Sequence, residues 1–174
     1  MLKPLIATAL PLLLLTSAVQ AERFQVPETT LSFDAPEGFA QLDRALIEAK
    51  FPNRNAPTWV VGNARGTTTI ACGLRPSSLA PAQLEPALTG MGDVIARITP
   101  GHQWVERKLI DLAGTRWIHF EMTSTAADTD IHNIMLITSY ETRMLACNFN
   151  ATVKDFAKLE TALRASIETM RFED

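Results

Sequence analysis

The sequence predicts an α+β fold in which a mostly antiparallel meander sheet is covered by amphipathic helices on both faces. Two observations lead to this prediction. From Gln103 onward, four β-prone runs follow one another with short connections, as in consecutive antiparallel hairpins. Two other segments carry apolar residues at helical spacing, and such helices bury their apolar stripe against a sheet.

The first part of the chain predicts short elements divided by turn residues. Two strands are expected at Arg23–Val26 and Thr29–Asp34. A short helix follows at Leu42–Phe51, and the proline after it ends the helix. Two further strands, Thr58–Val61 and Thr67–Leu74, are expected to form a hairpin around the glycine-containing segment between them.

The middle of the chain predicts one covering helix and the meander. The apolar stripe of this helix comprises Leu84, Leu88, Met91, Ile95 and Ile98. We expect its regular part to start at Pro86, because proline is tolerated in the first turn of a helix and not deeper. The meander strands are expected at Gln103–Leu112, Thr115–Thr125, Ile131–Tyr140 and Arg143–Asn150.

The register of the last hairpin shows why both faces need a cover. If residues 141–142 form a two-residue loop, Leu136 lies opposite Cys147 on an apolar core face. The opposite face is also too apolar for open solvent, because it carries Met135, Ile137, Met144 and Ala146. The second cover is the C-terminal helix, which Thr152 can cap. Its buried stripe is expected to be Phe156, Leu159, Leu163, Ile167 and Met170.

Residues 1–21 predict a secretory signal peptide that is cleaved after Ala21. Lys3 supplies a positive start, residues 5–15 form an apolar run dense in leucine, and small residues precede the cleavage point. The apolar run is too short to span about 30 Å of hydrocarbon; a retained anchor is the alternative. We therefore expect residues 22–174 to be one periplasmic or secreted domain with no transmembrane segment.

Cysteine usage agrees with export. The chain contains two cysteines, Cys72 and Cys147, and both belong to the mature part. An even pair in an exported protein favours a disulfide, which would close a long loop and contribute about 4 kcal/mol in the chain-entropy model. Two buried free thiols are the alternative, because cysteine is also a common core residue.

The charge pattern argues against a nucleic-acid partner. The formal net charge is −3 at pH 7, and lysine and arginine are scattered along the chain. Phosphate binding needs a concentrated basic face, which this pattern does not provide. The sequence also lacks the spacing of known cofactor motifs, since the glycines at 62 and 66 come without the lysine and helix of a phosphate loop.

Three segments resemble one known family: Leu31–Phe39 near the mature start, Ile110–Trp117 leading into the meander, and Ser166–Phe172 closing the last helix. Together with the order of elements, they resemble the Mog1/PsbP-like α/β/α sandwich, including small bacterial relatives of the DcrB and DUF1795 type. The resemblance implies a non-enzymatic binding or accessory protein. Family members include a transport factor that binds a small GTPase, a photosystem II subunit, and chaperones for secreted toxins. The turn at residues 141–142 departs from the glycine- or asparagine-containing turn expected there.

One pair of residues could carry chemistry. His119 and Glu121 share a face of one expected strand, where a carboxylate beside an imidazole could serve as base and orienter in proton transfer. We interpret the pair as a polar strip at the end of the sheet, and His132 joins it only if the hairpin register allows. No close-spaced histidine or cysteine pair indicates a metal site, and no glycine-flanked serine indicates a hydrolase. Neither catalytic, metal nor cofactor residues are assigned.

Three functional hypotheses follow. The first is an exported cell-envelope binding or accessory protein that recognises another protein, in a specific form as an immunity or chaperone partner of a secreted toxin. The second is a small-molecule or lipid carrier with a pocket between sheet and helix. The third is an enzyme that uses His119 and Glu121. The sequence leaves open the partner, the binding surface and the oligomeric state.

Overall fold

We describe the protein from a computed structural model, which describes residues 21–51, 56–126 and 129–173. The expected signal peptide, apart from Ala21, and the proline expected to end the first helix lie outside these residues. In the part of the chain that is described, no helix is long and apolar enough to cross a membrane.

The main sheet has seven strands in the order β3-β4-β5-β9-β8-β7-β6, and every neighbouring pair is antiparallel. Its strands are β3 Ala40–Gln41, β4 Val61–Gly62, β5 Thr68–Ser78, β6 Gln103–Leu112, β7 Thr115–Ala126, β8 Thr129–Tyr140 and β9 Arg143–Thr152. The meander from β6 to β9 confirms the three consecutive hairpins that the sequence predicts. A separate three-stranded sheet comprises β1 Arg23–Gln25, β2 Leu31–Asp34 and β10 Arg171–Phe172.

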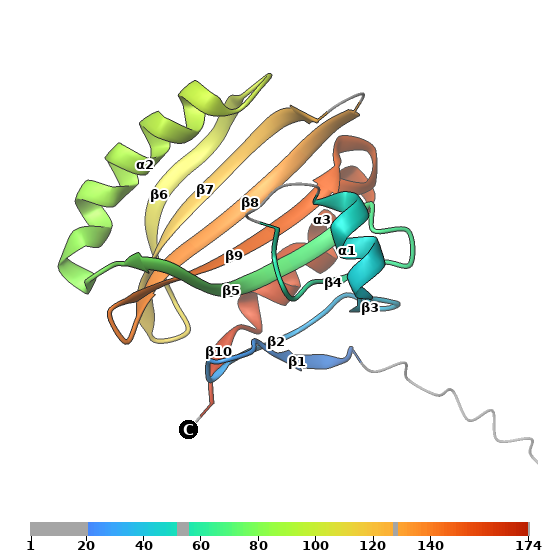
Figure 1. Cartoon of the computed structure of the whole chain (residues 1–174), viewed down its shortest axis with the longest axis horizontal. Helices are drawn as coiled ribbons and strands as arrows, with labels where there is room; N and C mark the ends of the chain where they lie inside the picture. The colour runs from blue at the N-terminus through green and yellow to red at the C-terminus, as the bar shows by residue number, and fades with distance from the viewer. Residues whose placement is uncertain (1–20, 52–55, 127–128, 174) are drawn as a thin grey trace, which may run out of the picture.

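Helices cover both faces of the main sheet, as predicted (Figure 1). On one face lie α3, Val153–Glu168, and the small sheet, which enclose a core around Phe33, Phe149 and Leu163. On the other face lie α2, Leu84–Ile98, and α1, Arg44–Lys50. A short 3-10 turn, Pro81–Gln83, leads into α2.

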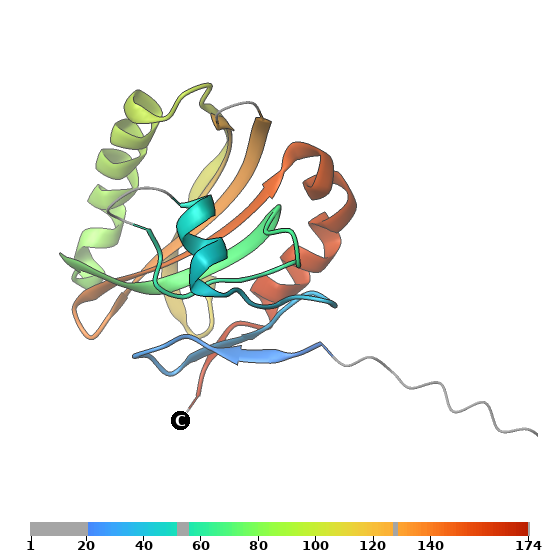
Figure 2. The ribbon, with the colours of Figure 1, turned by 45° about the vertical axis from the view of Figure 1, so that its right-hand side comes forward.

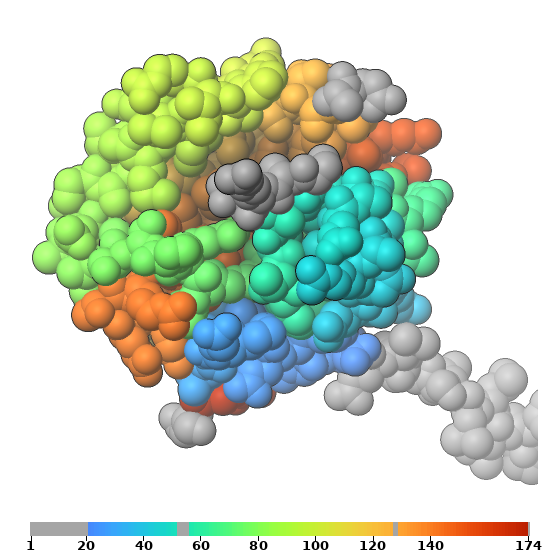
Figure 3. All heavy atoms as spheres, viewed as in Figure 1, coloured from blue at the N-terminus to red at the C-terminus, as the bar shows by residue number. Residues whose placement is uncertain are grey.

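The two helices on the second face are well separated (Figure 2). The helix α2 packs over β6 and β7, where Leu84, Ile118 and Phe120 form one core cluster. The helix α1 packs over β4 and β5, where Ile47 and Val60 belong to another cluster. In the space-filling view α2 and α1 form two distinct raised parts of this face (Figure 3). Among the described residues, no helix lies directly on the middle of the sheet between α1 and α2.

The predicted register of the last hairpin is confirmed. Tyr140 pairs with Arg143 and Leu136 with Cys147, so residues 141–142 form the two-residue loop. Both loop residues have left-handed backbones, with φ of 50° at Glu141 and 65° at Thr142. This is the backbone of a type I′ turn, whose twist matches the strands but which favours asparagine and glycine. The departure from the family pattern therefore leaves two ordinary side chains in a costly conformation.

The predicted disulfide joins Cys72 of β5 to Cys147 of β9. The two residues lie directly opposite each other in the β5–β9 register, on the face that α3 covers. The bond links residues that are 75 positions apart in the sequence. Cys72 and Cys147 are 5% and 0% exposed, so the disulfide is part of the core.

Some element boundaries differ from the sequence prediction. The helix α2 starts at Leu84 rather than at Pro86, because the prolyl nitrogen within the first turn would have no intrahelical partner in any case. The strand expected at Thr58–Val61 is only Val61–Gly62, whereas β5 continues to Ser78. The short strands β3 and β10 were not predicted, since two-residue strands have no alternation to recognise.

Candidate functional site

Two groups of residues are candidates for function, and the first is the pair predicted from the sequence. His119 and Glu121 lie on β7 with their side chains on the α3 face, and they are 7% and 3% exposed. The edge strand β6 adds Glu106 opposite Glu121, after an irregularity in the register between Trp104 and Glu106. The pair is thus buried within the sheet and does not form an open strip at its end.

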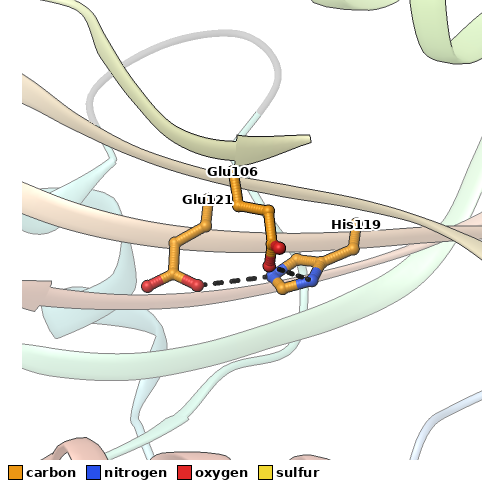
Figure 4. Close-up of side chains that lie close together, drawn as sticks. All are labelled: Glu106, His119 and Glu121. Atoms are coloured by element: carbon orange, nitrogen blue, oxygen red, sulfur yellow. Dashed lines mark ion pairs between the residues drawn. The ribbon is translucent and has the colours of Figure 1, made fainter. Parts of the chain in front are cut away.

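The His119 ring lies between two carboxylates (Figure 4). Its Nδ1 is 3.8 Å from Oε2 of Glu106, and its Nε2 is 3.5 Å from Oε2 of Glu121. Lys108 also contacts Glu106, with Nζ 2.9 Å from Oε2. These distances are those of electrostatic contacts and are too long for strong hydrogen bonds to the ring.

The main hydrogen bonds to Glu121 come from Arg164 and His132 rather than from His119. Arg164 of α3 donates from Nη2 to Oε1 at 2.7 Å and from Nη1 to Oε2 at 3.2 Å. His132 of β8 places Nε2 at 2.8 Å from Oε1, and its ring stacks on Phe156 with centroids 3.5 Å apart. Burial alone would raise the pKa of Glu121, but the contact with His119 and the hydrogen bonds from His132 and Arg164 outweigh it and hold the pKa well below its usual range.

This geometry suits an internal ion-pair network better than a reaction centre. The ligand atoms of Glu106, His119 and Glu121 lie within 4.8 Å of one another, but the two ring nitrogens of His119 face different carboxylates. One metal ion cannot use both nitrogens, and the Arg164 fork already occupies Glu121. None of the five main hollows among the described residues is lined by His119 or Glu121. The network fastens α3 to the sheet.

The second candidate is a hollow at one end of the main sheet, which we call the amide hollow. It has a volume of about 460 Å³ and lies between the C-terminal end of α1 and the ends of the central strands. Asn133 of β8 and Asn150 of β9 are paired in register and form part of its wall, and Asn133 donates to Oγ of Ser124 at 2.9 Å. The amide hollow is lined by Lys50, Phe51, Gly66, Thr67, Thr69, Ser124, Ala126, Thr129, Ile131, Asn133, Asn150, Ala151 and Thr152.

A second hollow of about 430 Å³ adjoins the first and is more charged, so we call it the basic hollow. The two share Thr67, Thr129 and Thr152 as lining residues. The basic hollow is lined in addition by Arg65, Asp130, Val153, Lys154, Asp155 and Lys158. A hydrogen bond from Thr67, with the charges of Arg65 and Lys158, lowers the pKa of Asp155.

With the fold and both candidate sites described, the chain can be compared with known proteins. No protein-family model and no curated protein matches the sequence. Among solved structures, the chain is similar to cyanobacterial PsbP (CyanoP) from Synechocystis sp. PCC 6803, with a TM-score of 0.59, 9% identity, and coverage of 91% of this chain and 95% of that one. The chain has the Mog1/PsbP-like fold. It is also similar to LpqN of Mycobacterium tuberculosis, described as involved in cell envelope biogenesis, with a TM-score of 0.58, 14% identity, and coverage of 87% and 84%.

On this Mog1/PsbP-like fold, the three tryptophans are packed within the protein. Trp117 is fully buried and donates its indole N–H to the Leu112 carbonyl at 2.9 Å. Trp59 is 8% exposed within the core that α3 covers. Trp104 is half-buried against Phe120, with ring centroids 5.3 Å apart. These contacts indicate that the tryptophans stabilise the fold rather than anchor a partner.

Sequence reasoning identified part of each site. It paired His119 with Glu121 and placed the hairpin strands that carry Asn133 and Asn150, but it did not include Arg164 or Lys50. Arg164 lies one turn after Glu160 on α3, so its contact with Glu121 depends on how the helix docks onto the sheet. Lys50 ends a separate helix whose position over β5 has no signal in the sequence. The glycines at 62 and 66 lie in and after β4, within the predicted β4–β5 hairpin.

Proposed function

We propose that this protein is exported and acts outside the cytoplasm as a binding or accessory protein that recognises another protein. In this proposal residues 1–21 are the signal peptide and residues 22–174 are the mature domain. The Cys72–Cys147 disulfide supports export, because such bonds persist in oxidising compartments. The likeness to CyanoP and LpqN supports an accessory role, in line with what the resemblance implies.

The amide hollow is the observation that carries the proposal. Its wall offers two amide side chains, Asn133 and Asn150, together with the hydroxyls of Thr69, Ser124 and Thr129. Uncharged donors and acceptors of this kind match the N–H and C=O groups of a peptide backbone. By contrast, His119 and Glu121 line none of the five hollows compared among the described residues, so a binding site is better supported at the amide hollow.

A site-specific crosslink tests whether the hollow contacts a protein. A photoreactive amino acid is placed at Thr129, an exposed residue that lines both hollows, and at Thr89, an exposed residue of α2, as the matched control. We expect illumination of the native envelope to give a discrete protein adduct from Thr129 and none from Thr89. Absence of any adduct from Thr129, or the same adducts from both positions, would contradict the proposal. A secreted toxin in the adduct would support the immunity or chaperone form.

A carrier of a small polar molecule is the second candidate. The volume of about 460 Å³ lies within the range of small-molecule sites, and Phe51, Ile131 and Ala151 add apolar surface to the polar wall. Native mass spectrometry of protein purified without denaturation is the test. A stoichiometric mass increment that disappears when Ala126, an exposed residue lining the hollow, is replaced by Trp would favour the carrier over protein recognition.

A further inference from the structure

Most basic side chains of this protein are neutralised by a neighbouring carboxylate. Eight of them have a carboxylate oxygen within 4.0 Å: Arg23, Arg44, Arg107, Lys108, Arg116, Arg143, Arg164 and Arg171. Within the described ranges, six others have no such partner, namely Lys50, Arg65, Arg75, Arg97, Lys154 and Lys158. Four of these six line the amide and basic hollows. Unpaired positive charge is therefore concentrated at one place on an acidic protein.

The position of Lys154 carries an electrostatic cost. Lys154 is in the first turn of α3 and Lys158 is in the next turn. The N-terminal end of a helix is the positive end of its dipole, so cations there are disfavoured. No carboxylate among the described residues forms an ion pair with Lys154 to offset this cost. Residues that cost stability, such as an unpaired lysine at a helix N-terminus, are found mainly at functional sites.

The acidic residues nearby do not cancel the positive charge. Asp130 and Asp155 line the basic hollow, against Arg65, Lys154 and Lys158 there and Lys50 in the amide hollow. Asp155 is already engaged by Thr67 and feels the charges of Arg65 and Lys158. Asp130 accepts a hydrogen bond from Thr125 at 2.8 Å. Among the described residues, four cations thus face two carboxylates, which is an excess of positive charge.

The two hollows form one trough, because they share Thr67, Thr129 and Thr152. One half of the trough combines amides and hydroxyls with the apolar side chains of Phe51 and Ile131. The other half carries the unpaired cations. A single small anion would contact the cations but would leave the amides, hydroxyls and apolar side chains unused. An extended peptide with apolar and acidic side chains would match every part of the trough.

We propose that the trough binds an extended acidic segment of the partner protein. An apolar side chain of that segment packs against Phe51 and Ile131, its backbone bonds to the wall amides and hydroxyls, and its carboxylates pair with Lys154 and Lys158. The inference rests on the proposed function, since it specifies the chemistry of the partner that the same surface recognises.

Two variants with equal changes in net charge test the inference. The trough variant replaces both Lys154 and Lys158 with Ser. The control variant replaces both Arg75 and Arg97 with Ser; these arginines form no ion pair with a described residue and lie outside the trough. The probe is an octapeptide array in which Leu or Phe is combined with acidic, basic or neutral residues, read at low salt. We expect acidic peptides to bind at least tenfold more tightly than their basic counterparts. The trough variant should lose at least tenfold and the control variant less than twofold.

Three results would overturn the inference. One is an array without preference for acidic peptides, and another is an equal loss in both variants, which would indicate a general charge effect. The third is binding of a sulfated polysaccharide or of phosphatidylglycerol vesicles at the same lysines without acidic peptide binding. If the Thr129 crosslink forms while both variants behave like wild type, the proposed function stands and the acidic partner does not. Melting curves of both variants check that they fold. We expect the trough variant to fold, because neither lysine forms an ion pair with a described residue.

Discussion

The contact between Arg164 and Glu121 gives the clearest prediction about stability. Replacing Arg164 with Leu removes two hydrogen bonds to a carboxylate that is 3% exposed. Removing one partner of a fully buried pair costs about 3–5 kcal/mol. Here Arg164 is itself 40% exposed and His132 still contacts Glu121, so solvent and the remaining bond reduce the loss. We expect the free energy of unfolding at pH 7 to fall by about 2 kcal/mol.

Urea denaturation of a double-mutant cycle measures this contact. The R116L variant is the matched control, because Arg116 pairs with Asp111, whose side chain is 78% exposed, and we expect less than about 0.5 kcal/mol there. The E121L/R164L double variant should be more stable than R164L by at least about 1 kcal/mol, since it leaves no unpaired buried charge. The reasoning would be refuted if the loss in free energy of unfolding of E121L/R164L equalled the sum of the losses of E121L and R164L.

The same contact predicts a pH dependence. The pKa of Glu121 in the folded protein lies below its unfolded value near 4.5, so its ion pairs stabilise the protein fully above that value. This stabilisation is lost as the pH falls below about 4.5 toward the folded pKa. The free energy of unfolding of wild type should therefore drop more steeply between pH 5 and 3 than that of E121Q. Parallel curves for the two proteins would contradict the assignment.

Three further predictions concern the scaffold. Replacing residues 141–142 with Asn-Gly should raise the melting temperature by about 2–4 °C, because both positions have positive φ, and an unchanged value would argue against the observed turn. Thiol labelling of the denatured, unreduced protein should find no free thiol, and reduction of the Cys72–Cys147 bond should lower stability by about 4 kcal/mol. G62A should destabilise by at least about 1 kcal/mol, because a Cβ there meets the Thr68 carbonyl oxygen at 2.7 Å, whereas G73A meets nothing within 4 Å and serves as the control.

The sequence predicts the meander well because its signals are local. Alternating apolar residues and a two-residue loop determine which side chains are neighbours, and so place Leu136 opposite Cys147. The same alternation puts Cys147 on a covered face, where Cys72 meets it from the next strand. These inferences need no knowledge of how distant elements dock.

The parts that could not be predicted depend on docking. Whether His132 reaches Glu121 depends on the β7–β8 register, in which His132 pairs with Thr123. The Arg164 contact depends on the rotation and height of α3 over the sheet, which many apolar contacts determine together. The trough depends on the position of α1 relative to the strand ends, since Lys50 and Phe51 complete its wall.

Membership of the DcrB and DUF1795 group stays a prediction.

Crosslinking from Thr129 in the native envelope, carried out in both charge-variant backgrounds, tests the central claim most directly. The account predicts a discrete protein adduct in wild type and in the Arg75 and Arg97 variant. It predicts at least a tenfold weaker adduct in the Lys154 and Lys158 variant. No adduct in wild type, or an adduct of equal strength in all three proteins, would contradict the claim that this trough recognises an acidic protein segment.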